Sequence, residues 1–442
     1  MMRSLATVLV AAFSLTTPLS AASVAAAPPS PRPRAVVLVI GDGISVELLT
    51  AARIYKHGAQ GRLALERLPQ SAFVRTWSAN SMVTDSSSAA SALARGIKAV
   101  NGRVGIPEAG KPGPESILDI ARASGWSTGI VTDDSVVGGT PASFYVEEDD
   151  RKAYPRLAGK ALAQLGPRLD LLIGGGSAWF RIEPGFAYAG PDSPVVAETS
   201  KALETLRAAG KVRFFDAWEA FVARAKPGAD TPPVLGTFAP DTLPYIADGP
   251  RTPTLLDLTR EAVLELESRG KPYFLMVEAA LPDKASHMNE GLRAVNEVLE
   301  MDAVIDWLDR TLSPDSMLLA TTDHGTGGLV VNGYLPLRAR GNTLFIANPG
   351  NGLPIVSWAT GPGGSKPGEP AQAPIKDAAE VRPGSRQIGS AFTGSAMHTG
   401  GDVWLIGRGP GSERVRGFMD NTDIFKLLQS AVTGRPPTSP DN

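Results

Sequence analysis

The fold we expect is decided by the stretch Ala35-Val36-Val37-Leu38-Val39-Ile40-Gly41-Asp42-Gly43. Its apolar residues form an unbroken β-prone run, which is typical of a strand buried on both faces of a parallel sheet. The run stops at Gly41, so Asp42 comes directly after the strand's carboxyl end. Open α/β sheets bind their ligands at that end of their strands. We therefore expect Asp42 to belong to a binding site.

Later segments repeat this pattern of an apolar run that ends at glycine or acidic residues, at 129–132, 171–173, 274–277 and 317–322. Between them lie Ala-, Leu- and Glu-rich stretches that predict helices at 114–124, 156–165, 255–268 and 291–308. The alternation predicts a doubly wound α/β fold, with a mostly parallel central sheet and helices on both faces.

Composition excludes several classes of protein. Among 442 residues, Lys+Arg 43 against Asp+Glu 45 give a net charge of -2, so no basic field argues for a nucleic-acid partner. A hydrophobic content of 43% and a charged content of 20% are typical of a globular chain. The absence of cysteine excludes disulfides, thiolate metal sites and a cysteine nucleophile.

The ends of the chain predict export. Residues 1–27 have the pattern of a signal peptide, with Arg3 before a short apolar run and small residues after it. A membrane anchor is the alternative for that run, although it is short for a bilayer span. No later run is long enough to span, so we expect a protein of the periplasm or the external medium. Residues 28–33 form a proline-rich spacer, 34–435 the mature domain, and 436–442 a tail.

Residues 329–397 differ in character from the rest of the domain. They are rich in glycine and proline, as in Gly361-Pro362-Gly363-Gly364, which predicts an irregular, turn-rich insertion. We expect this insertion to form a surface subdomain or loops near the mouth of the site.

Three of the four histidines stand near acidic residues. His287 follows Asp283 by one helical turn, His324 follows Asp323 directly, and His398 precedes an aspartate by four residues. Imidazole and carboxylate together suit Zn²⁺, so the pattern predicts a site for several metal ions. A surface acid beside a buffering imidazole is the alternative for each one taken singly.

Ser86 precedes a strongly helix-forming run that ends at Gly96. A serine at a helix N-terminus lies among free backbone N–H groups that favour an anion such as phosphate. The alternative is an ordinary helix cap, because serine is common there.

Taken together, a set of motifs spread over residues 36–425 resembles those of the alkaline phosphatases. They are Gly41-Asp42-Gly43, Val83-Thr84-Asp85-Ser86, Gly96, Asn101-Gly102, Thr140-Pro141-Ala142, Glu278 with Asp283 and His287, 322–328, His398-Thr399-Gly400 and 420–425. The resemblance implies a phosphomonoesterase that acts on small phosphate monoesters and releases inorganic phosphate. It suggests a homodimer only loosely.

The resemblance also implies a role for each matching residue. Ser86 would be the nucleophile that becomes a phosphoserine, and Arg151 would bind the phosphoryl oxygens. Lys284 matches a bacterial variant in which a lysine faces the phosphate through water; a solvated helix lysine is the alternative. One zinc ion would be held by Asp283, His287 and His398, and a second by Asp42, Asp323 and His324. A magnesium ion would be held by Asp42, Thr140 and Glu278.

Gly138 departs from the family pattern. It lies two residues before Thr140, where the family usually has an aspartate or histidine that helps to order the magnesium shell. Glycine has no side chain for this role, so we expect a weaker or differently hydrated Mg²⁺ site. Asp133 or Asp134 would substitute if the loop folds back.

Two other functions stay open at this stage. A phosphodiesterase or sulfatase-like hydrolase could use the same fold, although Ser86 is followed by Ser87-Ser88-Ala89-Ala90 and lacks the Pro and Arg of a sulfatase motif. A non-catalytic export protein that binds metal or phosphate is the third reading, because a fold alone does not prove a function.

Overall fold

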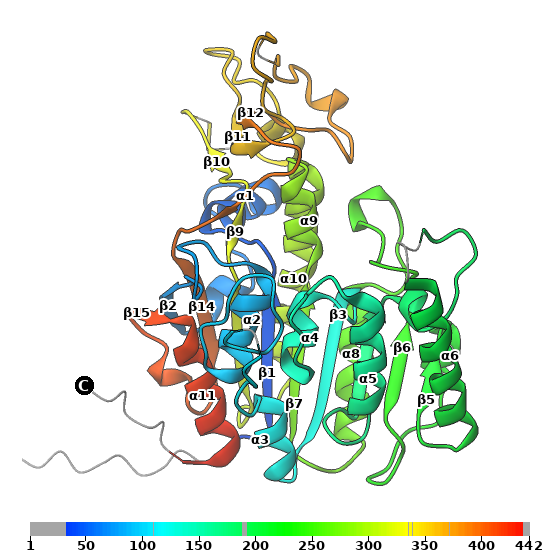
Figure 1. The fold of residues 1–442 in the computed structure, drawn as a ribbon. Coiled ribbons are helices and arrows are strands. Elements are labelled where there is room, and N and C mark those ends of the chain that lie inside the picture. Colours follow the sequence, from blue (N-terminus) through cyan, green and yellow to red (C-terminus); the bar gives the residue numbers. More distant parts are fainter. Residues whose placement is uncertain are drawn as a thin grey trace, which may run out of the picture.

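A ten-stranded sheet forms the centre of the computed structural model, which describes residues 32–108, 110–187, 192–334, 336–337, 339–370 and 372–435 (Figure 1). The predicted signal peptide, residues 28–31 of the spacer and the tail lie outside the described residues. In spatial order the strands are β15 (Phe418–Asp420), β2 (Gln70–Arg75), β14 (Val403–Arg408), β8 (Met317–Thr322), β1 (Ala35–Gly41), β7 (Tyr273–Ala279), β3 (Ser127–Ser135), β4 (Leu171–Gly175), β6 (Val234–Thr237) and β5 (Arg213–Phe215).

The sheet is mostly parallel. From β8 through β1, β7, β3, β4 and β6 to β5, every neighbouring pair of strands is parallel. Only β14 runs against its neighbours β8 and β2, and β15 is again parallel to β2. The predicted fold class is confirmed.

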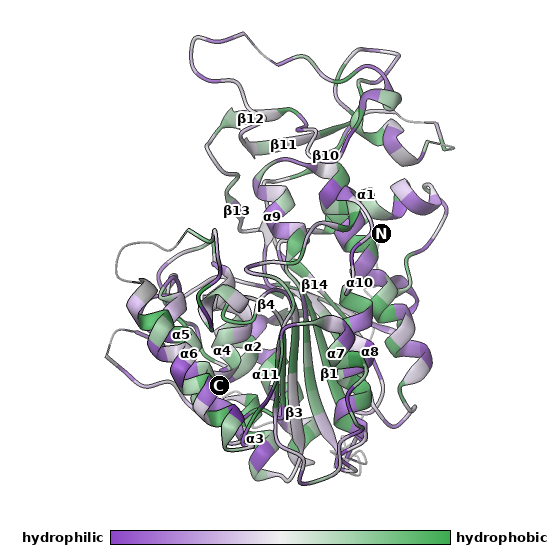
Figure 2. Cartoon of the chain, turned by 90° about the vertical axis from the view of Figure 1, so that its right-hand side faces the viewer, coloured by the Kyte–Doolittle hydropathy of each residue, from purple (hydrophilic) through white to green (hydrophobic). Residues whose placement is uncertain are grey.

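The central strand β1 contributes to two hydrophobic cores, one on each face of the sheet, as period-two alternation requires. Val37 and Val39 pack in the core that contains α1 (Val46–His57), α8 (Leu255–Glu267) and α10 (Gly291–Thr311). Leu38 and Ile40 pack in the opposite core, which contains α2 (Ser86–Arg95), α3 (Ile117–Ala123), α4 (Gly139–Tyr145), α5 (Tyr154–Gln164), α6 (Asp192–Ala208) and α11 (Asn421–Thr433). The apolar sheet between the two helical layers is visible in Figure 2.

Local caps explain where the predicted helices begin. We expected one helix from residue 114, but α3 begins at Ile117, because Ser116 and Asp119 form a capping box there. The same device, with Thr254 and Asp257, begins α8 at Leu255, as expected.

Strands β3, β4 and β7 extend beyond their predicted ends. Thr132 still pairs with Glu278 in the ladder between β3 and β7, and Ser135 pairs with Gly175 of β4. Backbone pairing therefore continues through polar residues that we had placed after the strands. As a result, Glu278 and the pair Asp133 and Asp134 lie within strands.

Residues 329–397 include a small second sheet and are less irregular than the sequence predicts. The second sheet consists of β10 (Val330–Val331), β11 (Val356–Gly361) and β12 (Gly389–Phe392). This sheet lies beyond α1 and α9 (Leu281–His287) at one end of the molecule (Figure 1). Trp358 and Phe345 anchor the segment, because both are buried in the α1 and α10 core. Among the described residues, no helix has the length and apolar character needed to cross a membrane.

Candidate metal and phosphate site

The carboxyl ends of three neighbouring strands bring the first acidic residues together. Gly41 of β1 pairs with Ala279 of β7 on one side and with Thr322 of β8 on the other. Asp42, Glu278 and Asp323 therefore meet at one edge of the sheet, where the sequence placed them.

The inner cluster consists of Asp42, Asp323 and His324, and all three residues are buried. One ligand atom from each lies within 4.8 Å of the others. His324 Nε2 is 3.3 Å from Asp323 Oδ2 and 3.6 Å from Asp42 Oδ1. Two carboxylates and one imidazole in this arrangement are a set of donors that suits a three-ligand cation site.

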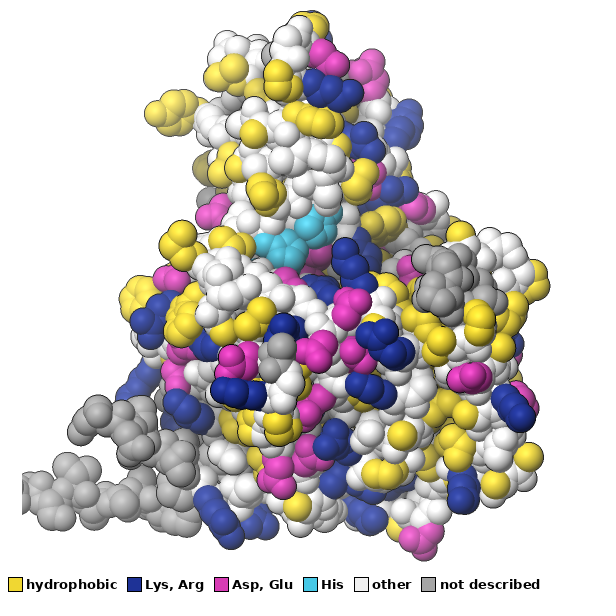
Figure 3. Space-filling view, viewed as in Figure 1, with side chains coloured by type: hydrophobic (Ala, Val, Ile, Leu, Met, Phe, Trp, Pro, Cys, Tyr) yellow, Lys and Arg dark blue, Asp and Glu magenta, His cyan; other side chains and the backbone are white. Residues whose placement is uncertain are grey.

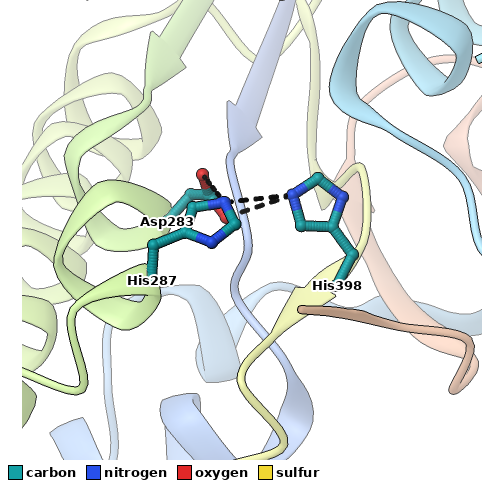
Figure 4. Close-up of side chains that lie close together, drawn as sticks. All are labelled: Asp283, His287 and His398. Atoms are coloured by element: carbon teal, nitrogen blue, oxygen red, sulfur yellow. Dashed lines mark hydrogen bonds and ion pairs between the residues drawn. The ribbon is translucent and has the colours of Figure 1, made fainter. Parts of the chain in front are cut away.

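The outer cluster consists of Asp283, His287 and His398 (Figure 4). His287 Nε2 lies 3.2 Å from Asp283 Oδ2 and 3.2 Å from His398 Nε2. Asp283 and His287 share one face of α9, while His398 comes from the short strand β13 (His398–Thr399). Histidine side chains are visible in the hollow between the β10–β12 segment and the body of the protein (Figure 3).

Backbone pairing joins the two clusters. His398 of β13 pairs with Thr326 of β9 (Gly325–Thr326), two residues after His324. The rings of His324 and His398 consequently stack, with centroids 3.6 Å apart. Thr326 Oγ1 also donates a hydrogen bond to Asp283, so one threonine contacts both clusters.

The far nitrogens of the outer histidines are held by backbone carbonyls. His398 Nδ1 lies 3.1 Å from the Thr84 carbonyl oxygen, and His287 Nδ1 contacts that of Ala396. A ring that donates Nδ1–H to a carbonyl presents an unprotonated Nε2, which is the form that binds a metal. Both Nε2 atoms point into the cluster.

The inner carboxylates fit a cation. The buried atoms Asp42 Oδ1 and Asp323 Oδ2 accept no hydrogen bond from the described residues. Burial, reinforced by Asp283, raises the pKa of Asp323 to about 7, and burial and Asp323 likewise raise the pKa of Asp42. A buried carboxylate oxygen without a hydrogen-bond donor is costly unless a cation neutralises it. Oxygen and nitrogen donors of this kind suit Zn²⁺.

Ser86 lies at the N-terminus of α2, beside the inner cluster. Asp85 caps this helix by accepting a hydrogen bond from the Ser88 backbone N–H at 2.9 Å, and Gly96 ends it in a left-handed conformation. Ser86 Oγ is 3.2 Å from His324 Nε2. The serine hydroxyl thus lies next to a ligand atom of the inner cluster and among the first N–H groups of a helix.

Arg151 reaches the same helix end. Its Nη1 forms an ion pair of 3.0 Å with Asp85 Oδ2. Burial lowers the pKa of Arg151, but Asp85 and Asp42 outweigh burial, so the pKa is raised overall. A Cβ on Gly139 would come within 2.9 Å of the Arg151 guanidinium, so the glycine leaves room for it.

Of the expected magnesium ligands, Asp42 follows β1, Glu278 lies in β7 and Thr140 lies in α4. Thr132 donates a hydrogen bond to Glu278. Burial and the nearby Asp134 raise the pKa of Glu278 to about 8, although the hydroxyls of Thr132 and Thr140 favour its charged form. Thr140 and Glu278 therefore lie close to each other.

Lys284 faces the site but already has a partner. Its Nζ lies 3.2 Å from Asp134 Oδ1, and Asp134 is the main cause of its raised pKa. The side chain is 38% exposed, so it is neither buried nor free in solvent.

Several contacts of the site escaped the sequence analysis. Thr326 stands two residues after His324 in a motif that we noted, but its bond to Asp283 depends on the β9–β13 pairing. Asp85 was quoted only as part of the serine motif, whereas it both caps α2 and binds Arg151. The carbonyls that hold His398 and His287 carry no sequence signal at all.

Fold and site together define an α/β protein in which two clusters that could hold cations lie beside a serine. Comparison with known proteins is in agreement. The model of the family "Alkaline phosphatase" matches residues 33–433. Streptomycin-6-phosphate phosphatase from Streptomyces griseus is 31% identical over 93% of this chain and 93% of that protein.

Solved structures agree as well. Thermus thermophilus alkaline phosphatase is 25% identical, with a TM-score of 0.69 over 92% of this chain and 93% of its own. The alkaline phosphatase of the Antarctic bacterium TAB5, at 21% identity, has the same fold, with a TM-score of 0.67 over 91% of this chain and 98% of its own.

The chain belongs to the alkaline phosphatase family. It is thus a phosphoric monoester hydrolase of a metal-dependent family, and the expected resemblance is confirmed.

Proposed function

We propose that the protein hydrolyses small phosphate monoesters through a phosphoserine formed on Ser86, and releases inorganic phosphate. The observation that carries this proposal is the 3.2 Å approach of Ser86 Oγ to His324 Nε2, at the point where the inner cluster meets the N-terminus of α2.

The residues present fit three cations. Zn²⁺ would be held by the outer cluster and by the inner cluster, and Mg²⁺ by Asp42, Thr140 and Glu278. These ions would supply charge neutralisation and lower the pKa of the serine hydroxyl and of water. A variant of the TAB5 phosphatase binds Mg in a site called M3, which supports magnesium as the third ion.

The chain itself would bind and orient the phosphoryl group. Arg151 is fixed by Asp85, so its planar guanidinium is held in place for two phosphoryl oxygens. The free N–H groups at the start of α2 add positive potential beside Ser86. A phosphoryl group in transfer needs this alignment and charge compensation more than it needs further covalent help.

Location and assembly are part of the proposal. We propose export to the periplasm or the external medium, which rests on the signal pattern of residues 1–27. We also propose a homodimer, on the family resemblance alone.

The deciding experiment measures hydrolysis of an aryl phosphate by the protein and by Ser86→Ala, with and without added Zn²⁺ and Mg²⁺. Ser86→Ala should lose at least about 1,000-fold in turnover, because the nucleophile is gone. Ser88→Ala is the matched control, because the Ser88 hydroxyl donates to the Ala99 carbonyl, away from the clusters.

Equal turnover of wild type and Ser86→Ala would refute the mechanism. An aryl phosphate diester, assayed in parallel, tests the diesterase alternative, which gains support if the diester is the faster substrate. A protein that binds zinc but hydrolyses neither ester would instead be the non-catalytic binding protein.

A further inference from the structure

Gly138 and Asp134 compete for the same space. Gly138 begins α4 as its cap residue and has no side chain to offer the site. A Cβ built on Gly138 would lie 2.8 Å from Asp134 Oδ2, which is too close for a real contact. The Asp134 carboxylate therefore occupies the position that a side chain at 138 would need.

The geometry of β3 selects Asp134 over Asp133. Successive strand residues point to opposite faces of a sheet. Asp133 Oδ1 accepts a hydrogen bond of 2.7 Å from the Ala280 backbone N–H, and Arg251 and Glu300, on the α8 and α10 side, influence its pKa. Asp134 points the other way, toward Gly138 at the start of α4.

Asp134 also lies near Glu278, one of the three expected magnesium ligands. After burial, the charge of Asp134 is the largest influence on the pKa of Glu278, which it raises. Its Oδ1 pairs with Lys284, which leaves Oδ2 on the side of Gly138. Independently of these contacts, the buried Asp42 Oδ1 accepts no hydrogen bond from the described residues, as expected of an oxygen that binds a cation.

We propose that Asp134 provides, from strand β3, the positioning carboxylate of the Mg²⁺ site, and that Gly138 is required because it makes room for this carboxylate. This inference rests on the proposed function. Gly138 alone predicts a weak Mg²⁺ site. In the proposed site, the carboxylate that position 138 lacks is instead supplied by Asp134 of strand β3. Mg²⁺ prefers oxygen ligands and retains water, so a rim carboxylate that orders its hydration suits it.

The test is calorimetric titration of the zinc-loaded full-length protein with Mg²⁺. Asp134→Asn should weaken Mg²⁺ binding by about 10- to 100-fold, the usual effect of losing a residue that positions a metal ligand. Zinc content should be unchanged. Asp241→Asn is the matched control, because Asp241 is another carboxylate in the field of Lys284, whereas the carboxylate nearest to a Cβ on Gly138 is that of Asp134. The effect of Asp241→Asn should stay below about threefold.

Two further variants test the shared space. Gly138→Ala adds no charge, yet its Cβ must displace Asp134, so Mg²⁺ binding should weaken about tenfold or more. Gly159→Ala is its control, because a Cβ there meets Thr199 at an ordinary 3.6 Å. The double variant Asp134→Ala/Gly138→Asp moves the carboxylate to position 138 and should recover at least part of the lost affinity.

Each outcome bears on the inference separately from the proposed function. Mg²⁺ binding that is unchanged in Asp134→Asn, or absent in the parent protein, overturns the inference even if Ser86-dependent hydrolysis is intact. If Asp134→Asn loses its zinc or fails to fold, Gly138→Ala decides, and unchanged Mg²⁺ affinity in that variant overturns the inference. Equal turnover of an aryl phosphate by wild type and Ser86→Ala would instead refute the proposed function.

Discussion

The inner and outer clusters consist of similar side chains but have different surroundings. The inner His324 and Asp323 side chains are fully buried, whereas the outer His287 and His398 side chains are 27% and 17% exposed. The inner residues follow two central strands, β1 and β8. The outer residues come from the short helix α9 and from β13, a strand of only two residues.

This difference separates two tasks. A site fixed by central strands can hold the serine and the phosphoryl group in one geometry, because the hydrophobic cores on both faces restrain its backbone. A site on a short helix beside a hollow is better placed to meet water and the leaving group. We expect the inner cluster to be the less tolerant of change, and the predictions below test that order.

The largest effect should come from His324→Ala. Loss of this ligand removes the contact beside Ser86, so turnover of an aryl phosphate should fall by more than about 1,000-fold, with no recovery at high Zn²⁺. His287→Ala should lose about 100-fold and recover partly in excess Zn²⁺, because water can enter the exposed outer cluster as a replacement ligand.

His57→Ala is the control for both histidine variants. His57 is exposed at the end of α1 and belongs to neither cluster, so its removal should leave turnover unchanged. If the two cluster variants lose equal activity and respond equally to Zn²⁺, the distinction between the clusters is wrong.

A smaller effect is expected where the clusters meet. Thr326→Val keeps the side-chain shape but removes the hydroxyl that bonds Asp283 and lies 3.4 Å from His324 Nδ1. Affinity for both zinc ions should fall by about 10- to 100-fold, measured by competition with a chelator. Thr321→Val is the control, because its hydroxyl donates to the Trp404 carbonyl at 2.8 Å. A loss confined to one ion would show that Thr326 does not couple the clusters.

The smallest effect should come from Lys284→Ala. Lys284 follows the outer ligand Asp283 but is partly exposed and already paired with Asp134. Inhibition by inorganic phosphate should weaken about fivefold, in line with an ion pair worth about 1 kcal/mol. An unchanged inhibition constant would leave Lys284 as a solvated partner of Asp134.

The sequence predicted the central strands and the acidic residues at their carboxyl ends, because buried strands followed by polar residues leave a clear pattern. It also predicted which histidines lie beside which aspartates, since Asp283 and His287 share a helix face and His324 follows Asp323. It did not distinguish Asp133 from Asp134, because their contacts depend on which way each side chain leaves β3. The small sheet of residues 329–397 was missed, since turn residues dominate that segment.

The central claim is that Ser86 carries the phosphoryl group during turnover. The most direct measurement mixes the zinc- and magnesium-loaded protein with an aryl phosphate, quenches it in acid within milliseconds, and locates the phosphate by peptide mass spectrometry. The account predicts phosphate on Ser86 in the wild type and no phosphorylated peptide in Ser86→Ala. Phosphate on another residue, or rapid turnover without any phosphorylated peptide, would contradict it.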